Sequence, residues 1–240
     1  MRREFPVVPA HFGRIDYEGA EVLVGVTSRA MIMSRLRPVA KEPWTVRWLE
    51  RSARDGDVLY DVGANVGAYT LIAAALGLRV VAFEPGYANY AALCDNVVLN
   101  RRESTVTPLP VVLADRTGLA TLGYSDVAAG AAEHALDGVG DAAYRQPVLT
   151  YRLDDLVEQF ALPAPALLKV DVDGAEDSVL GGAPRTLSSE SLRSVLVEIE
   201  RGADGVVPLL EQAGFALRER IEDRDGEPLG RVWYGIFERP

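Results

Sequence analysis

The sequence has little cysteine and little histidine, and both shortages limit the kinds of site it can build. Its single cysteine, Cys94, cannot form an internal disulfide or a cysteine-based zinc site. The two histidines, His11 and His134, lie too far apart in the sequence to resemble a helical pair of metal ligands. We therefore expect no metal centre.

Positive charge is also scarce, with 25 Lys and Arg against 35 Asp and Glu, which gives a net charge of −10. Nucleic-acid affinity depends on basic side chains that neutralise phosphates, so this balance argues against DNA or RNA as a substrate. The same charge argues against docking on an anionic membrane. The sequence leaves the oligomeric state open.

Long apolar runs are absent as well. The stretch 71–78 is too short to span a bilayer and is followed at once by Arg79. Charges and prolines follow the N-terminus, where a secretory signal would have a continuous apolar segment. With 48% apolar residues among 240, the chain can bury one large α/β core. We expect a soluble, cytoplasmic protein.

From residue 56 onward, short apolar strands alternate with helical segments, which predicts a mostly parallel sheet with helices on both faces. The expected strands are 58–60, 80–83, 106–113, 167–172 and 195–197, and the expected helices are 68–76, 90–99, 153–160, 176–187 and 205–213. The last two apolar segments, 215–221 and 232–237, flank Asp225-Gly226 and predict an antiparallel hairpin.

Two segments depart from this alternation. Residues 1–55 are expected to form an N-terminal extension packed on the core domain 56–240, with a hairpin over 14–27 and a helix over 44–53. Residues 123–146 are too long and too poor in large apolar residues for an ordinary connection. We expect 123–146 to form the acceptor-side wall of the site and to close over the substrate; a solvent-exposed insertion is the alternative.

The strongest local signal is the loop from Asp61 to Gly67, which reads Asp-Val-Gly-Ala-Asn-Val-Gly and joins a strand to a helix. Its glycines, Gly63 and Gly67, allow a sharp turn and a close approach to a ligand at the carboxyl ends of the strands. Asn65 occupies a position where the dinucleotide fingerprint requires glycine against the pyrophosphate. Asp61 would repel a phosphate but could hold an ammonium group. The loop favours a phosphate-free nucleoside; a tight turn without a ligand is the alternative.

Acidic residues end two further strands. Glu84 follows the second strand about 20 residues past the first glycine, where an acid binds ribose hydroxyls in nucleotide-binding folds. Asp171 and Asp173 share one side of an extended chain with Lys169. Charged residues at the end of an apolar strand are costly unless paired or hydrated, which points to a site; capping of the next helix is the alternative for both aspartates.

Three blocks of sequence, taken in their order along the chain, resemble the FkbM-type methyltransferases. The blocks are Tyr60–Thr70, then Ala82–Pro85 with the downstream Asn96 and Asn100, and then Leu168–Glu176. The resemblance implies the Rossmann-like class I methyltransferase fold, S-adenosylmethionine as cofactor and a small-molecule acceptor. It further implies transfer to a hydroxyl of a natural product or a sugar-like molecule.

The resemblance also implies roles for individual residues. Asp61 and Gly63 would face the methionine part of the cofactor, Asn65 and Gly67 would shape the loop, and Glu84 would bind the ribose; Asp115 matches the position that contacts adenine. This chain departs from the family at Asp173, where Glu is common. It departs again at Arg152, where Thr is usual, so we assign no role to Arg152.

An alcohol acceptor must lose its proton, which requires a general base. Asp171 and Asp173 are candidates by position, and His134 is a candidate by its intrinsic pKa. The two aspartates could instead hold Mg²⁺, for which two carboxylates are weak support. A NAD-dependent oxidoreductase, disfavoured by Asn65, and a cofactor-binding module without catalysis are the competing hypotheses.

Overall fold

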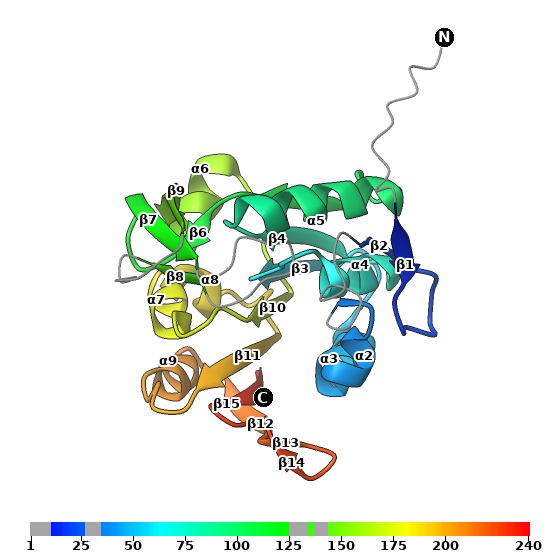
Figure 1. Ribbon diagram of the computed structural model, residues 1–240. Coiled ribbons are helices and arrows are strands. Elements are labelled where there is room, and N and C mark those ends of the chain that lie inside the picture. Colours follow the sequence, from blue (N-terminus) through cyan, green and yellow to red (C-terminus); the bar gives the residue numbers. More distant parts are fainter. Residues whose placement is uncertain (1–10, 27–34, 125–133, 137–143) are drawn as a thin grey trace.

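The computed structural model describes residues 11–26, 35–124, 134–136 and 144–240 (Figure 1). Its centre is a seven-stranded sheet with the order β12-β15-β11-β10-β3-β4-β5. These strands are β3 Val58–Val62, β4 Arg79–Phe83, β5 Val106–Leu109, β10 Leu167–Val170, β11 Ser194–Glu200, β12 Ala216–Ile221 and β15 Val232–Glu238. Neighbours from β11 to β5 run parallel, and β15 is antiparallel to β11 and β12. The predicted fold, including the C-terminal hairpin, is confirmed.

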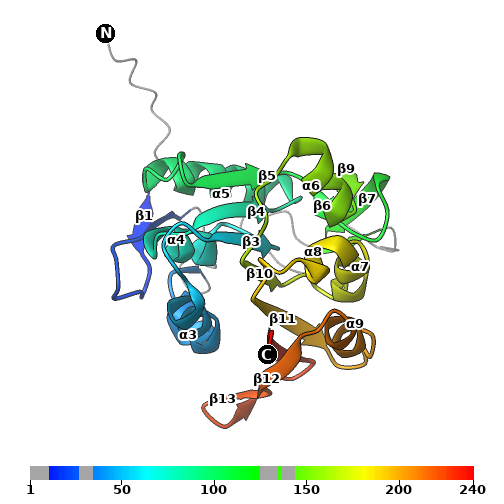
Figure 2. The same ribbon diagram turned by 180° about the vertical axis from the view of Figure 1, so that it is seen from behind.

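Helices cover both faces of the central sheet (Figures 1 and 2). One face packs against α3 Pro43–Ser52, α4 Ala68–Ala75 and α5 Tyr87–Leu99, and the other against α6 Leu153–Phe160, α7 Glu176–Gly181, α8 Pro184–Ser188 and α9 Val206–Gln212. Strand residues alternate between the two apolar clusters, with Leu59 in one and Tyr60 in the other. This period of two places a buried layer on each side of the sheet.

The N-terminal region adds a two-stranded ribbon and a short helix before α3. These elements are β1 Phe12–Arg14, β2 Leu23–Gly25 and α2 Pro38–Lys41. The side chain of Asn96 on α5 accepts the N–H of Gly25 at 2.7 Å and donates to the carbonyl of Val66 at 2.8 Å. Asn96 therefore ties the ribbon to the loop between β3 and α4, and Asn100 bonds the backbone of Leu23 in the same ribbon.

The prediction of one strand over 106–113 is wrong. Strand β5 ends at Leu109, and β6 Val112–Leu113 belongs to a second, four-stranded sheet with the order β6-β9-β7-β8. Pro110 lies between the two strands and has no N–H for a sheet hydrogen bond, so the chain can leave the central sheet there.

The second sheet contains the described ends of the predicted insertion 123–146. Its other strands are β7 Gly118–Tyr124, β8 His134–Leu136 and β9 Tyr144–Tyr151. Residues 125–133 and 137–143 lie outside the described residues, so the predicted acceptor-side wall stays a prediction for them.

The prediction of one helix over 176–187 is also wrong. Helix α7 ends at Gly181 and α8 begins at Pro184, whose ring suits the first turn of a helix. The buried carboxylate of Asp154 accepts the backbone N–H groups of Arg185 at 2.7 Å and Thr186 at 2.9 Å. These bonds satisfy donors that would otherwise be orphaned at a new helix start.

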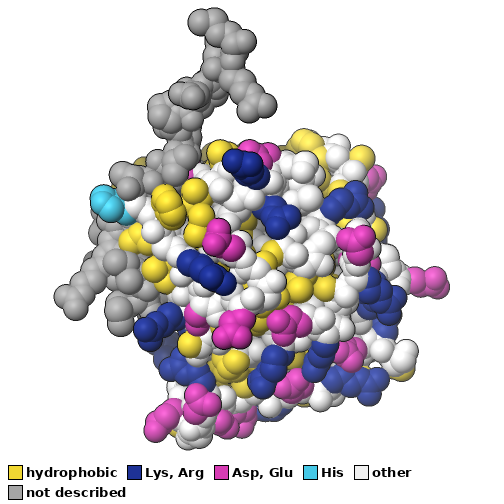
Figure 3. Space-filling view, turned by 90° about the vertical axis from the view of Figure 1, so that its right-hand side faces the viewer, with side chains coloured by type: hydrophobic (Ala, Val, Ile, Leu, Met, Phe, Trp, Pro, Cys, Tyr) yellow, Lys and Arg dark blue, Asp and Glu magenta, His cyan; other side chains and the backbone are white. Residues whose placement is uncertain are grey.

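Two properties bear on the predicted location and on the predicted absence of membrane and nucleic-acid partners. Within the described residues, no helix combines the length and the apolar character needed to cross a bilayer. On the face shown in Figure 3, basic and acidic side chains lie interspersed. The cytoplasmic location stays a prediction.

Candidate active site

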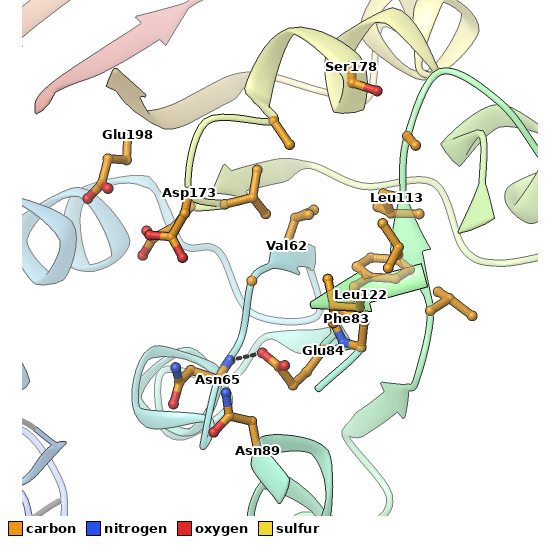
Figure 4. Close-up of a pocket in the computed structure, with 18 of the residues that line it drawn as sticks. Val62, Asn65, Phe83, Glu84, Asn89, Leu113, Leu122, Asp173, Ser178 and Glu198 are labelled. Carbon is orange, nitrogen blue, oxygen red and sulfur yellow. Dashed lines mark hydrogen bonds between the residues drawn. The ribbon is translucent and has the colours of Figure 1, made fainter. Parts of the chain in front are cut away.

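A pocket opens at the carboxyl ends of the central strands (Figure 4). Its empty volume is about 1080 Å³, counting the part open to solvent. Open α/β sheets bind ligands in this crevice. Five predicted site residues line it, namely Gly63, Asn65, Glu84, Asp171 and Asp173.

The loop after β3 is held tightly between β4 and β10. Gly63 has φ +82°, and a Cβ at this position would lie 1.9 Å from the carbonyl oxygen of Asp171. The N–H groups of Gly63 and Ala64 both donate to the carbonyl of Phe83, at 3.0 and 3.1 Å. Asn65 also has a positive φ, +51°, which asparagine tolerates better than most residues. The backbone of this loop therefore forms one wall of the pocket.

Glu84 is bonded directly to this loop. Its Oε2 accepts the N–H of Asn65 at 2.8 Å, and its Oε1 accepts the N–H of Gly86 at 2.8 Å. Burial raises the pKa of Glu84 to about 7, although the two backbone N–H groups and the Asn89 side chain act in the opposite direction. Three protein donors thus occupy about three of the four lone-pair positions of the ionised carboxylate, which leaves at least one for a ligand hydroxyl.

Asp61 lies beneath the pocket and is not among its described lining residues. Its carboxylate accepts the Thr70 hydroxyl at 2.5 Å and lies 3.6 Å from Lys169 Nζ. Both Asp61 and Lys169 are only 1% exposed. The structure pairs Asp61 with a buried lysine, and its contact with the methionine part of the cofactor stays a prediction.

Lys169 also binds Asp171, with a distance of 2.8 Å from Nζ to Oδ2, and lies 5.2 Å from the centre of the Tyr69 ring. Burial alone would lower the pKa of Lys169, but the carboxylates of Asp171 and Asp61 raise it above its ordinary value. Burial likewise opposes ionisation of Asp171, yet Lys169 lowers the pKa of Asp171 overall. Lys169 and Asp171 are therefore a charged pair.

Asp173 follows in the loop between β10 and α7, after the strand has ended at Val170. It is exposed and lines the pocket. Figure 4 shows Asp173 and Glu198 on one side of Val62, and Phe83, Leu113 and Leu122 on the other. The pocket therefore has an acidic end and an apolar wall.

Three other predicted site residues lie outside the pocket lining described here. Asp115 is exposed and its N–H donates to the Ser178 hydroxyl at 3.1 Å, while Ser178 itself lines the pocket. Gly67 precedes α4 at its N-terminus. His134 begins β8 opposite Tyr124, and only its backbone is among the described parts of the structure. The role of Asp115 at adenine and the role of His134 as a base stay predictions.

Glu198 was not among the predicted site residues, yet it lines the acidic end of the pocket from β11. Glu198 interrupts the apolar run of β11 close to its carboxyl end, which is the signal that identified Glu84 and Asp171. The same test applied to the strand at 195–197 would have found it. Lys41 and Arg35 were missed for another reason, because they reach the pocket from the N-terminal region.

The apolar wall is supported by the second sheet. Leu122 of β7 lines the pocket, and the Gln146 side-chain amide donates to the carbonyl of Pro85 at 3.0 Å. Tyr124 donates its hydroxyl to the same Gln146, and its ring centre lies 6.1 Å from that of Tyr87. The described ends of the segment 123–146 therefore contact the turn after Glu84.

Among the described residues, no group of three or more His, Cys, Asp or Glu side chains is arranged to hold a metal ion.

Solved structures with this architecture include several methyltransferases. A precorrin-6y C5,15-methyltransferase from Geobacter metallireducens has a TM-score of 0.52 at 13% identity, over 98% of both chains. A methyltransferase FkbM from Methylobacillus flagellatus has a TM-score of 0.50 at 14% identity, over 84% of this chain and 62% of the other. At these identities the likeness establishes the fold.

Sequence comparison establishes the family. Residues 61–217 match the methyltransferase FkbM domain. The hexuronic acid methyltransferase AglP of Haloferax volcanii is 34% identical over 80% of this chain and 77% of its own length. The 31-O-demethyl-FK506 methyltransferase FkbM of Streptomyces tacrolimicus is 31% identical over 68% and 74%. The resemblance drawn from the three blocks is confirmed, and the chain belongs to the FkbM methyltransferase family.

Proposed function

We propose that this protein transfers the methyl group of S-adenosylmethionine to a hydroxyl oxygen of a small-molecule acceptor. The observation that carries the proposal is Glu84, a buried carboxylate that lines the pocket and is bonded to the loop at Asn65. A carboxylate at this point of an α/β sheet suits the two hydroxyls of a ribose. Family membership supports methyl transfer as the reaction.

The residues of the pocket fit this cofactor in three places. Glu84 would accept the ribose hydroxyls, and the apolar wall of Phe83, Leu113 and Leu122 would cover the adenine. The acidic end would favour the positive charge of the sulfonium and ammonium groups. Bound here, S-adenosylmethionine supplies an electrophilic methyl group, and the chain must orient the acceptor oxygen behind it.

A NAD-dependent oxidoreductase fits the same pocket less well. Asn65 places a side chain in the loop where a pyrophosphate needs glycine. A module that binds the cofactor without catalysis would share the site but lack turnover. Methyl transfer to an acceptor, followed by mass spectrometry, separates these hypotheses.

Two observations support a class of acceptor, namely the names of the relatives and the net charge of the chain. One relative is named for a hexuronic acid and another for a 31-O-demethyl compound, and both names describe small molecules with oxygen nucleophiles. The net charge of −10 disfavours a nucleic acid as acceptor. We therefore propose a sugar-like or natural-product alcohol.

The cofactor assignment predicts a thermal shift. A ligand that binds only the folded state stabilises it by about 2.7 kcal/mol at a hundred times its Kd. We expect saturating S-adenosylmethionine or S-adenosylhomocysteine to raise the Tm by roughly 5–10 °C, growing with concentration. NAD at the same concentration should produce little shift in differential scanning fluorimetry. An equal or larger shift with NAD would contradict the cofactor assignment.

The raised pKa of Glu84 predicts that cofactor binding depends on pH. With a pKa of about 7, Glu84 is mostly protonated at pH 6 and mostly ionised at pH 8, and the ionised form is the stronger acceptor for a ribose hydroxyl. We expect the affinity for S-adenosylhomocysteine, measured by calorimetry, to fall about tenfold from pH 8 to pH 6. This ligand has no sulfonium charge, so the acidic end contributes less to the change.

Two variants test whether Glu84 causes the pH dependence of S-adenosylhomocysteine binding. Glu84→Gln should bind more weakly at pH 8 and lose most of the pH dependence. Glu103→Gln, which changes an exposed glutamate, should behave as the wild type. An unchanged pH dependence in Glu84→Gln would show that another group is responsible.

A further inference from the structure

Asp171 is poorly suited to accept a proton from an acceptor. Its Oδ2 is bonded to Lys169 Nζ at 2.8 Å, and this lysine keeps the pKa of Asp171 below its ordinary value despite burial. A carboxylate that binds protons weakly is a weak general base. The other carboxylates at the acidic end of the pocket are Asp173, which is exposed to solvent, and Glu198, which is half-buried.

Glu198 has the required position. It lies on β11 in a half-buried environment and lines the pocket near the end of β10, where Val170 pairs with Val197. Figure 4 shows its side chain on the same side of the pocket as Asp173, opposite Ser178 and Leu113. Glu198 thus reaches the end of the pocket away from the apolar wall.

Tyr234 fixes the Glu198 side chain. Tyr234 lies directly opposite Glu198 on the antiparallel strand β15, and its hydroxyl donates to Glu198 Oε2. The Tyr234 ring is itself packed against Trp44, with 4.9 Å between ring centres. This bond occupies one carboxyl oxygen, and no other hydrogen bond to Glu198 is found among the described residues.

We propose that Glu198 is the general base that takes the proton of the acceptor hydroxyl, an inference that rests on the proposed function. As the O–H proton moves to Glu198, the acceptor oxygen forms a bond to the methyl carbon with its lone pair. The carbon–sulfur bond breaks and its electron pair remains on sulfur. The products are a methyl ether, a neutral thioether and a protonated Glu198, which returns its proton to solvent.

The groups around Glu198 favour proton binding near neutral pH. Burial raises the pKa of Glu198 to about 8, with help from the charge of Asp171 at the end of β10 and of Glu42 beside α2; the Tyr234 hydrogen bond and Lys41 act in the opposite direction. A general base works best when its pKa lies near the working pH. The rate constant should therefore rise with pH up to about 8.

This assignment also narrows the acceptor class. An alcohol must lose a proton to become a good nucleophile, whereas a carboxylate acceptor is already ionised at neutral pH and needs no base. A pocket with a dedicated proton acceptor is therefore built for ether formation. Methyl glucuronide is a useful probe because it offers both hydroxyls and a carboxylate, and mild alkali cleaves a methyl ester but leaves a methyl ether intact.

The decisive variant is Glu198→Gln, with Glu200→Gln as its matched control two residues along the same strand. With methyl glucosides and methyl glucuronide as probe acceptors, Glu198→Gln should lower kcat by about 10²- to 10⁴-fold, with KM and S-adenosylhomocysteine affinity little changed. It should also lose the rise of kcat with pH. Tyr234→Phe removes a donor that lowers the pKa of Glu198, so the rise should move to higher pH. Glu200→Gln should match the wild type.

The experiment distinguishes failure of the Glu198 assignment from failure of the proposed function. Wild-type methyl transfer with an unchanged pH profile in Glu198→Gln, or a methyl ester as the only product, would overturn the base assignment and leave methyl transfer intact. Absence of S-adenosylhomocysteine binding would overturn the proposed function and the base with it. An infrared titration of the Glu198 carboxyl, identified by its loss in Glu198→Gln, needs no acceptor: ionisation near pH 8 is expected, and a carboxyl still protonated at pH 10 would overturn the inference.

Discussion

Replacing Lys169 by methionine is expected to lower the free energy of unfolding by about 3–5 kcal/mol, because it leaves buried carboxylates without their cation. Lys169 is 1% exposed and lies 2.8 Å from Asp171 and 3.6 Å from Asp61. Methionine fills a similar volume, so the loss measures charge and hydrogen bonding more than packing. Urea unfolding followed by circular dichroism gives the difference directly.

Two further variants show whether the loss of stability in Lys169→Met comes from the buried charges. Arg185→Met removes an arginine that is 62% exposed and should cost much less, because solvent screens a surface ion pair. The double variant Lys169→Met with Asp171→Asn should lose less than the sum of the single changes, because one unpaired charge is removed. A loss below about 1 kcal/mol in Lys169→Met, or strict additivity in the double variant, would show that the pair contributes little.

The same pair sets a pH window. Asp171 has a folded-state pKa below its ordinary 3.8, so its contribution to stability is complete above that pH and is lost as the pH falls through the lowered value. Lys169 has a folded-state pKa above its ordinary 10.5, so its contribution is complete below that pH and is lost as the pH rises through the raised value. Stabilisation by the pair should therefore be constant between these limits.

The sequence predicts well which strand ends line the pocket, and the reason is local. Gly63, Asn65 and Glu84 each sit at the carboxyl end of a strand, and parallel strands bring those ends to one edge of a sheet. The parallel direction of most strands follows from the alternation of strands and helices. Neither conclusion needs knowledge of a distant side-chain contact.

Contacts between distant elements could not be predicted in this way. The sequence places Lys169 and Asp171 on one side of a strand, but the burial of Asp61 beside them depends on the pairing of β10 with β3. The bond between Tyr234 and Glu198 depends on the register of β15 against β11. Strand register is fixed by the packing of whole faces, so a motif search does not reveal it.

Gly63→Ala is expected to destabilise the fold and to weaken cofactor binding together. The methyl group would lie 1.9 Å from the carbonyl oxygen of Asp171, and a backbone atom cannot move aside as a flexible side chain can. The positive φ of +82° adds a conformational cost of about 1–3 kcal/mol, and the steric clash adds a similar amount. We expect a total loss of about 2–6 kcal/mol in urea unfolding.

Gly56→Ala separates the two contributions, because Gly56 has a similar φ of +79° but nothing within 4 Å of an added Cβ. It should lose only the conformational part and should bind S-adenosylhomocysteine as the wild type does. In Gly63→Ala the loop must shift away from Asp171, and this shift displaces the Asn65 N–H that is bonded to Glu84. We therefore expect at least a tenfold weaker affinity in calorimetry for Gly63→Ala alone. Equal stability and equal affinity in the two variants would show that the loop can accommodate the methyl group and that its close contact with Asp171 is not required.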